Sequence, residues 1–258
     1  MKVAITGASG NVGRQALAAF EETDHEITPI THDVTEDIEG LIADVTDYES
    51  VSEALSGQEA VIHLAANPSP EAEWEDVLGV NVNGAYNVYE AAVENGLDRV
   101  VFASTNHVSQ MYNAASPDEP ESLVEDPDVI DPDDPPRPDS YYGVSKVAGE
   151  ALGSYYADRH GLEVVNVRIG WLMDESELEE TQDDAERRAR FARAMWLSPG
   201  DCRNAIRGAT TASLPENPVT VNVVSANDDR YLSLTHAIRG IGYRPRDNAT
   251  EALCDDTR

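Results

Sequence analysis

The stretch TGASGNVG at residues 6–13 sets three glycines, Gly7, Gly10 and Gly13, between a predicted strand and a predicted helix. The first glycine allows a tight turn, the second lets backbone approach a pyrophosphate, and the third lets the helix pack closely on the strand. The first turn of that helix offers free N–H groups and the positive end of a dipole to an anion. This context indicates a dinucleotide-binding cradle rather than a merely structural turn.

The rest of the chain alternates short apolar runs with longer amphipathic segments. Apolar, β-branched runs predict buried strands at 2–7, 26–30, 60–65, 99–104, 163–170 and 219–224. Helical patterns occupy 12–22, 48–56, 73–95 and 142–160, and a closing helix and turn follow at 233–245. This order predicts an α/β Rossmann-type fold with a doubly wound parallel sheet. We expect a single domain over 1–258 with a small C-terminal substrate-binding portion, its binding elements mainly in 105–140 and 170–215.

The charge balance is strongly acidic. The chain carries 49 acidic and 18 basic residues, a formal net charge of −31, and its lysines are Lys2 and Lys146 alone. Such a surface repels itself until salt screens it. The composition is similar to that of proteins from salt-accumulating halophiles, although a generic acidic cytosolic enzyme is the alternative. Because 41% of the residues are apolar, one sizeable core is still expected.

Composition also limits partners and location. Nucleic acid and anionic membranes require clustered positive charge, so the composition argues against both. No apolar run approaches the roughly 20 residues that span a bilayer. The N-terminus enters a strand without the basic and apolar regions of a signal peptide. Cys202 and Cys254 are too few and too isolated for a disulfide framework or a metal site. We therefore expect a cytoplasmic protein.

Residues 113–139 interrupt the alternation. This segment, NAASPDEPESLVEDPDVIDPDDPPRPD, is too rich in proline and carboxylates to propagate a helix or a strand. Runs of charge are usually solvated loops. Because the segment directly precedes Tyr142, a flap over a functional site is the other interpretation.

Tyr142 and Lys146 lie four residues apart in the predicted helix 142–160, so they share a face. A tyrosine hydroxyl normally keeps its proton up to a pH of about 10. A fixed ammonium group nearby lowers that pKa and lets the oxygen accept a proton from a substrate hydroxyl. Arginine is bulkier and forked, which gives a reason to keep this lysine. The alternative is an incidental pair on one helical face.

The G-x-x-G-x-x-G spacing, with Tyr142 and Lys146, resembles the extended short-chain dehydrogenases/reductases of the NAD-dependent epimerase/dehydratase family. The resemblance covers nearly the whole chain. It includes ADVTD at 43–47, HLAA at 63–66, NVNGAYNVYEAA at 81–92 and IGYRP at 241–245. It implies a mechanism in which Tyr142 is the base and Thr105 orients the reacting hydroxyl.

The same resemblance implies a nicotinamide cofactor. An acidic residue after the second strand would select NAD. Here Asp33 stands slightly late, and no arginine stands ready for a 2′-phosphate, so we expect NAD without excluding NADP. The implied cofactor contacts are Gly7, Gly10, Asn11, Val12, Gly13, Asp44, Val45, Leu64, Ala65, Ala66, Asn81, Tyr142, Lys146 and Ile169.

The run STNH at 104–107 resembles the SSNH of uronate dehydrogenases and of haloarchaeal NAD-dependent glucose-6-phosphate dehydrogenases, which oxidise C1 of an aldose to a lactone. That resemblance implies that Asn106 and His107 contact the sugar, although a lone histidine after a strand is often structural.

Arginines gather between residues 186 and 209, which suggests an anionic ligand in so acidic a chain. The alternative is pairing with acidic neighbours on the helix surface. In the similar sugar dehydrogenases, an arginine a few residues before a tryptophan binds the acidic group of the substrate. The matching position here holds Phe191, flanked by Arg190 and Arg193, which become the candidates.

Together these features predict NAD(P)-dependent oxidation of an aldose at C1, with a sugar phosphate or a uronate as the expected substrate. A nucleotide-sugar epimerase or dehydratase with tightly bound NAD is the alternative, but 258 residues leave little room for its longer substrate lobe. A second alternative is a nicotinamide-sensing protein without catalysis. The intact Tyr142, Lys146 and Thr105 argue against this alternative. A homodimer built on 73–95 and 142–160 is typical of the family.

Overall fold

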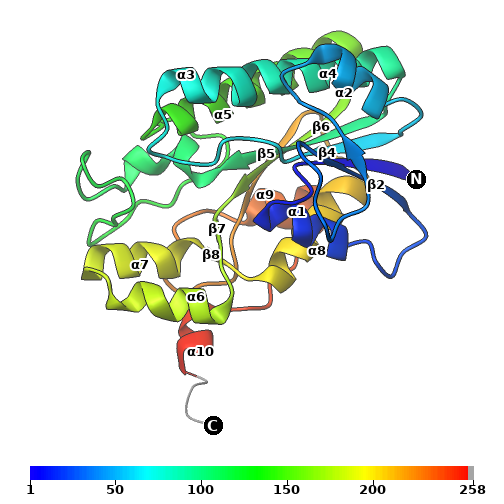
Figure 1. Cartoon of the computed structure of the whole chain (residues 1–258). Coiled ribbons are helices and arrows are strands. Elements are labelled where there is room, and N and C mark those ends of the chain that lie inside the picture. Colours follow the sequence, from blue (N-terminus) through cyan, green and yellow to red (C-terminus); the bar gives the residue numbers. More distant parts are fainter. Residues whose placement is uncertain (255–258) are drawn as a thin grey trace.

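The computed structural model of the chain describes residues 1–254 and is built around one parallel β-sheet (Figure 1). Its strands lie in the order β3-β2-β1-β4-β5-β6-β9, and every neighbouring pair is parallel. They are β1 (Lys2–Thr6), β2 (Glu26–Thr31), β3 (Leu41–Ile42), β4 (Ala60–His63), β5 (Arg99–Thr105), β6 (Glu163–Ile169) and β9 (Val219–Val223). The predicted doubly wound Rossmann-type sheet is therefore confirmed. The sequence pattern does not predict β3, because its two residues are exposed at the sheet edge.

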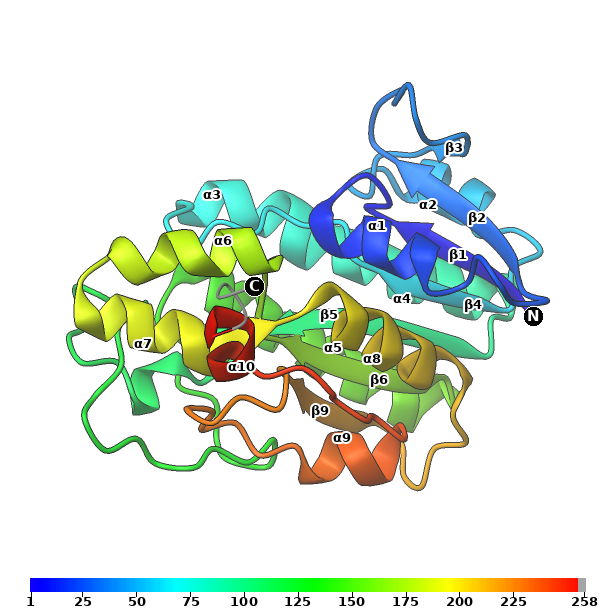
Figure 2. The same ribbon diagram turned by 90° about the horizontal axis from the view of Figure 1, so that it is seen from below.

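Helices cover both faces of the sheet (Figures 1 and 2). One face carries α2 (Tyr48–Ala54), α4 (Gly84–Asn95) and α5 (Tyr141–His160), and the other carries α1 (Asn11–Ala18), α8 (Pro199–Thr211) and α9 (Thr235–Gly240). Successive residues of one strand enter different cores: Val3 and Ile5 pack on the α1 side, whereas Ala4 packs on the α2 side. Burial on both faces explains why these strands are continuously apolar.

The predicted helix 73–95 is divided in the structure. It begins as α3 (Trp74–Val77), widens into a π-helical stretch, η1 (Leu78–Asn83), and continues as α4. The wider turn buries Asn81, whose amide nitrogen donates to the Asn67 carbonyl (3.0 Å) and to Ser145 Oγ (2.9 Å). The π-turn thus ties the loop after β4 to α5.

A smaller unit lies beyond the carboxyl ends of β5 and β6 (Figure 1). β7 (Trp171–Leu172) and β8 (Trp196–Leu197) pair in a separate two-stranded sheet, surrounded by α6 (Glu175–Glu180), α7 (Glu186–Met195) and α10 (Ala249–Cys254). Short 3-10 turns complete the elements: η2 (Asn106–Val108), η3 (Gln110–Tyr112) and η4 (Thr181–Asp183). These elements belong largely to the segments expected to bind substrate.

The acidic segment 113–139 is packed against the protein rather than extended into solvent. Leu123 and Ile130 are both buried in the core on the α8 side. The Leu123 amide donates to the Arg187 carbonyl (3.2 Å), and Ile130 forms a parallel bridge with Leu232. The segment therefore joins α7 to the region before α9.

Among the helices of residues 1–254, none is both long enough and apolar enough to cross a membrane.

Candidate active site

The glycine-rich turn connects β1 to α1. Gly7 has a φ of 68°, and a Cβ there would lie 2.7 Å from the Ala65 nitrogen. A Cβ on Gly13 would lie 2.2 Å from the Gly7 oxygen, whereas one on Gly10 would meet only that oxygen, at 3.4 Å. Within the described residues, no side chain caps the N-terminus of α1. The first N–H groups of the helix therefore remain available to an anion.

A cavity of about 770 Å³ extends from this turn. Most of the expected cofactor contacts line it: Gly7, Gly10, Asn11, Val12, Gly13, Asp44, Val45, Leu64, Ala65 and Ala66. A second cavity of about 350 Å³ adjoins it and is lined by Tyr142, Lys146 and Ile169. Asn11 and Leu64 line both cavities. The two cavities share lining residues and together extend from the glycine turn to Tyr142.

The opposite end of the larger cavity is acidic. Asp44 accepts hydrogen bonds from the Thr46 amide and hydroxyl, both at 2.8 Å. His32 also lines this end, and Asp33, which lies outside the lining, pairs with the His32 Nδ1 at 3.0 Å. That hydrogen bond raises the pKa of His32. Among the described residues that line this cavity, none is a lysine or an arginine.

Asn81 is an exception among the expected cofactor contacts, because it lines neither cavity. Its Oδ1 accepts from the Asn67 amide at 2.8 Å, and its Nδ2 already has two acceptors. With its hydrogen-bonding capacity used inside the protein, this residue positions the loop that follows β4.

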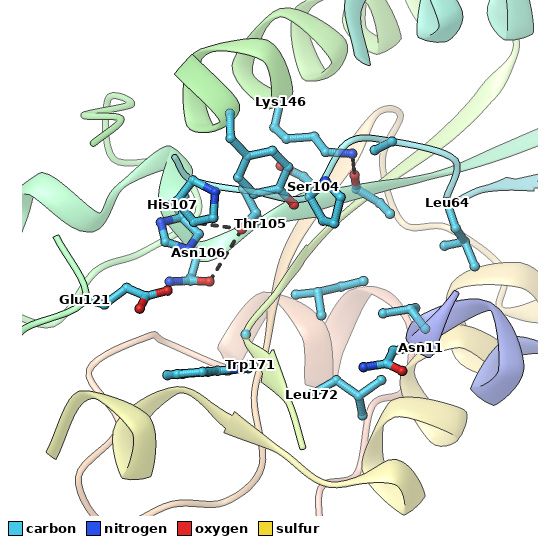
Figure 3. Close-up of a pocket in the computed structure, with 18 of the residues that line it drawn as sticks. Asn11, Leu64, Ser104, Thr105, Asn106, His107, Glu121, Lys146, Trp171 and Leu172 are labelled. Carbon is cyan, nitrogen blue, oxygen red and sulfur yellow. Dashed lines mark hydrogen bonds between the residues drawn. The ribbon is translucent and has the colours of Figure 1, made fainter. Parts of the chain in front are cut away.

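Tyr142 and Lys146 of α5 line the same cavity as Thr105, which ends β5. Figure 3 shows Lys146 and Thr105 in this cavity. The Lys146 Nζ donates to the Ala103 carbonyl at 2.8 Å. It also lies 5.1 Å from the centre of the Phe102 ring and 5.7 Å from that of Tyr142. All three predicted catalytic residues therefore face one cavity.

Close packing between α5 and β5 sets this arrangement. Ser140 caps the helix by accepting from the Gly143 amide at 3.1 Å. A Cβ on Gly143 would lie 2.6 Å from the His107 carbonyl oxygen, and one on Gly149 would lie 2.1 Å from the Phe102 ring. The two glycines bring the helix against the strand, which is why Tyr142 reaches Thr105.

The electrostatics correct one expectation. Burial raises the pKa of Tyr142 to about 12, and a hydrogen bond with Thr105 opposes that rise. Burial also lowers the pKa of Lys146 to about 8, opposed by Glu150. The expected lowering of the tyrosine pKa by the lysine is not found, because the ammonium is directed at the Ala103 carbonyl and desolvation of the phenolate outweighs other effects.

Asn106 and His107 both line the smaller cavity from η2. The Asn106 Nδ2 is buried and makes no hydrogen bond within residues 1–254. His107 Nδ1 lies 2.7 Å from Asp139 Oδ2, and the His107 ring meets the Tyr142 ring edge-on with centroids 5.8 Å apart. The two residues that resemblance assigned to the sugar therefore line the same cavity as Tyr142.

The expected anion-binding arginines do not line the smaller cavity. Arg190 donates to the carbonyls of Val124 and Glu125, each at 2.9 Å. Arg193 is 3.1 Å from Asp229 and binds other polar groups of α7 and η4. Both guanidinium groups hold neighbouring segments together, so the structure does not bring them to the site. Phe191, between them, lines the cavity instead.

Two findings identify the family of the chain. Residues 3–196 match the model described as the NAD dependent epimerase/dehydratase family. The chain is also 58% identical to an L-arabinose 1-dehydrogenase (NAD(P)(+)) of Haloferax volcanii over 252 residues, 98% of this chain and 99% of the relative. The chain belongs to the NAD dependent epimerase/dehydratase family.

Other members extend the comparison. A NAD-dependent glucose-6-phosphate dehydrogenase of Haloferax volcanii is 37% identical over 265 residues, 96% of this chain and 94% of the relative. A mutant uronate dehydrogenase from Agrobacterium tumefaciens complexed with NAD has a TM-score of 0.77 at 27% identity, covering 97% of this chain and 86% of that one. The predicted family is therefore confirmed.

Within this family site, the structure adds residues that sequence reasoning missed. Glu121 from the acidic segment and Trp171 from β7 line the smaller cavity. Glu150, one turn after Lys146, binds Arg168 through both oxygens (2.9 and 2.8 Å) and accepts from Ser104 Oγ (2.5 Å). The i, i+4 spacing from Lys146 was a signal for Glu150, whereas no local pattern points to Glu121.

Proposed function

We propose that this protein oxidises a neutral aldose at C1 to a lactone, with NAD as the hydride acceptor. The observation that carries the proposal is that Tyr142, Lys146 and Thr105 converge on a cavity that merges with the glycine-turn cavity. The names of the relatives support aldose oxidation, and the 58% identical relative acts on a neutral pentose. An epimerase is less well supported, because the 58% identical relative is a dehydrogenase and the match covers 99% of that relative.

In this mechanism, Tyr142 takes the proton of the sugar C1 hydroxyl while the C1 hydrogen leaves as a hydride. When bound, NAD supplies the acceptor for that hydride. Thr105 hydrogen-bonds the reacting oxygen and keeps it near the phenol. Lys146, which donates to the Ala103 carbonyl, would hold the nicotinamide ribose of the bound cofactor. General base catalysis of this kind contributes about 10²–10⁴-fold to the rate.

Glu150 supports this arrangement from one helical turn away. Its carboxylate is fixed by Arg168, which also donates to the Pro132 carbonyl at 3.2 Å. The fixed negative charge opposes the lowering of the Lys146 pKa and so favours the ammonium form. Arg168 thereby links the catalytic helix to the acidic segment.

The choice of a neutral sugar replaces the expected acidic one. The cavity wall has Phe191 where the similar sugar dehydrogenases have the arginine that binds the acidic group, and the nearby arginines are engaged elsewhere. The cation that does line the cavity, Lys146, is directed at a backbone carbonyl. A carboxylate or phosphate would therefore be desolvated at this wall without a cationic partner.

A homodimer is also proposed, built on α4 and α5. Large apolar side chains are exposed on these two helices, namely Tyr86 (47%), Tyr141 (52%), Val144 (39%) and Tyr155 (55%). Sedimentation at several protein concentrations tests it, with a Tyr155→Glu variant expected to shift the equilibrium to the monomer. A wild-type monomer at all concentrations would contradict it.

An absorbance assay for reduced nicotinamide tests the function directly. The protein is assayed in multimolar KCl with NAD or NADP and with L-arabinose, glucose 6-phosphate, glucuronate or galacturonate. We expect reduction of NAD with L-arabinose and none with the Tyr142→Phe variant. Absence of reduction with every sugar, together with nicotinamide retained through purification in both redox states, would favour an epimerase instead.

A further inference from the structure

Glu121 occupies one end of the smaller cavity. In Figure 3 it lies with Asn106 and His107 at one end, and Asn11 and Leu64 lie at the other. Asn11 borders the glycine turn, so the Glu121 end is the one away from the cofactor cradle. A sugar with C1 at Tyr142 therefore extends its remaining carbons toward Glu121.

The carboxylate of Glu121 is held by an arginine that does not line the cavity. Its Oε2 pairs with Nη1 of Arg188, whose Nε also binds Asp184 at 3.0 Å. The Arg188 guanidinium lies over the Trp171 ring, 5.4 Å from its centre, and does not itself line the cavity. One cation is thus shared by two carboxylates, and the net charge of this cluster is negative.

A hydrogen-bond donor faces this carboxylate. The Asn106 side chain is 4% exposed, and its Nδ2 makes no hydrogen bond within residues 1–254. Figure 3 shows the Glu121 carboxylate directed toward Asn106. Buried donors are rarely left unpaired in native proteins, so this amide points to a ligand that accepts. A hydroxyl that accepts from Asn106 and donates to Glu121 satisfies both groups.

We infer that Glu121 determines the charge specificity of the site: with Asn106 it binds a hydroxyl of a neutral aldose, and it rejects sugars that carry a carboxylate or a phosphate. The inference rests on the proposed aldose oxidation. Sites built to hydrogen-bond a hydroxyl discriminate strongly, because a wrong ligand leaves buried polar groups unpaired. An anionic substituent at this end also meets a like charge that Arg188 does not neutralise.

The test uses sugars that share one configuration. L-Arabinose, D-fucose, D-galactose and D-galacturonate match at C2, C3 and C4, and differ at C5 by hydrogen, methyl, hydroxymethyl or carboxylate. The wild type is expected to oxidise the neutral three and to discriminate strongly against galacturonate. The ratio of kcat/KM for L-arabinose to that for D-galacturonate is the quantity to measure.

In Glu121→Gln the shape is kept and the charge is removed, which also frees Arg188 from one partner. We expect the ratio to fall at least tenfold, with KM for L-arabinose rising and activity on galacturonate appearing. Glu119→Gln, an exposed change in the same segment outside this cavity, is the matched control and keeps the wild-type ratio. Binding of NADH, followed by the fluorescence of its reduced nicotinamide, checks that each variant is folded.

The outcomes separate the two proposals. If the wild type oxidises none of these sugars, the proposed function is wrong and this inference falls with it. If the wild type oxidises L-arabinose but Glu121→Gln keeps the same ratio, the inference alone is overturned. A wild type that prefers galacturonate would overturn it as well.

Discussion

The imidazole of His107 and the carboxylate of Asp139 form a close pair beside Tyr142, with Nδ1 and Oδ2 2.7 Å apart. The Asp139 side chain is fully shielded from solvent and also accepts from Ser140 Oγ at 2.8 Å. A carboxylate only accepts, so the hydrogen on His107 lies on Nδ1 and Nε2 is left for the site. Asp139 therefore orients a histidine that lines the cavity.

Asp139→Asn is expected to lower kcat/KM for the sugar, because an amide no longer fixes the tautomer of His107. The expected loss is about 2 kcal/mol, roughly thirtyfold in kcat/KM. The affinity for NAD should change little, since neither residue lines the larger cavity, which the glycine turn borders. Steady-state kinetics and NAD titration give both values, with the exposed Asp133→Asn as control. Wild-type kcat/KM in Asp139→Asn would contradict the positioning role.

Tyr142→Phe is expected to lower kcat by about 10²–10⁴-fold or more while NAD still binds. The change removes the proton acceptor and keeps the ring that packs against His107. Single-turnover absorbance measures the chemical step, and fluorescence titration measures cofactor affinity. Tyr141→Phe, one residue earlier and exposed, is the matched control. Retained turnover in Tyr142→Phe would remove this residue from the mechanism.

Substitutions of Gly10 and Gly13 in the glycine turn are expected to have different effects, one on NAD binding and the other on stability. Gly10→Ala places its Cβ 3.4 Å from the Gly7 oxygen, an ordinary contact, so the fold should persist while the new methyl group obstructs the pyrophosphate. Gly13→Ala would place its Cβ 2.2 Å from that oxygen and should unfold the turn. We expect a KM for NAD raised at least tenfold in the first variant and a lower Tm in the second. Equal effects on Tm would argue against this division.

Much of the fold could be predicted because its signals are local. Gly7 and Gly13 follow a strand, and helices on both faces of the sheet give continuously buried strands such as Ala60–His63. The widening of helix 73–95 at Asn81 could not be predicted, because its cause is tertiary: the amide of this residue bonds to a loop and to α5. β3 is too short to carry a pattern.

In the candidate site, too, some residues could be predicted from local sequence signals and others could not. Tyr142 and Lys146 share a helix, so their spacing reveals them, and Thr105 ends a strand in a recognisable run. Glu121 is one of many carboxylates in segment 113–139. The sequence does not show that this one pairs with Arg188 of α7. Arg190 and Arg193 looked like ligand contacts because sequence does not show that each guanidinium already has partners in the chain.

Stability is expected to depend steeply on salt. With a net charge of −31, repulsion between carboxylates grows as salt is removed, since the Debye length rises from about 3 Å at 1 M to about 10 Å at 0.1 M. We expect Tm to fall when KCl is lowered over this range. Circular dichroism measures it, and sucrose of equal osmolarity should not restore the loss. An unchanged Tm would mean that the acidic surface is of no consequence for stability.

The two shifted pKa values predict the pH dependence of catalysis. Near pH 7 the phenol of Tyr142 is protonated and the ammonium of Lys146 is charged, because their pKa values lie at about 12 and about 8. Raising the pH through about 8 removes one proton from the pair. The singly deprotonated pair includes the form with a phenolate and an ammonium, which is the competent base.

The rate should therefore rise about tenfold per pH unit below pH 8 and level off above it. In Lys146→Met the first proton must come from Tyr142 itself, so the break should move toward about 12. Activity at pH 7 should also fall, because the ribose contact proposed for Lys146 is lost. Plots of log kcat/KM against pH for both proteins test this, with circular dichroism confirming folding at each pH. A wild-type profile that is flat across pH 8 would show that the lysine and the tyrosine do not titrate as a pair.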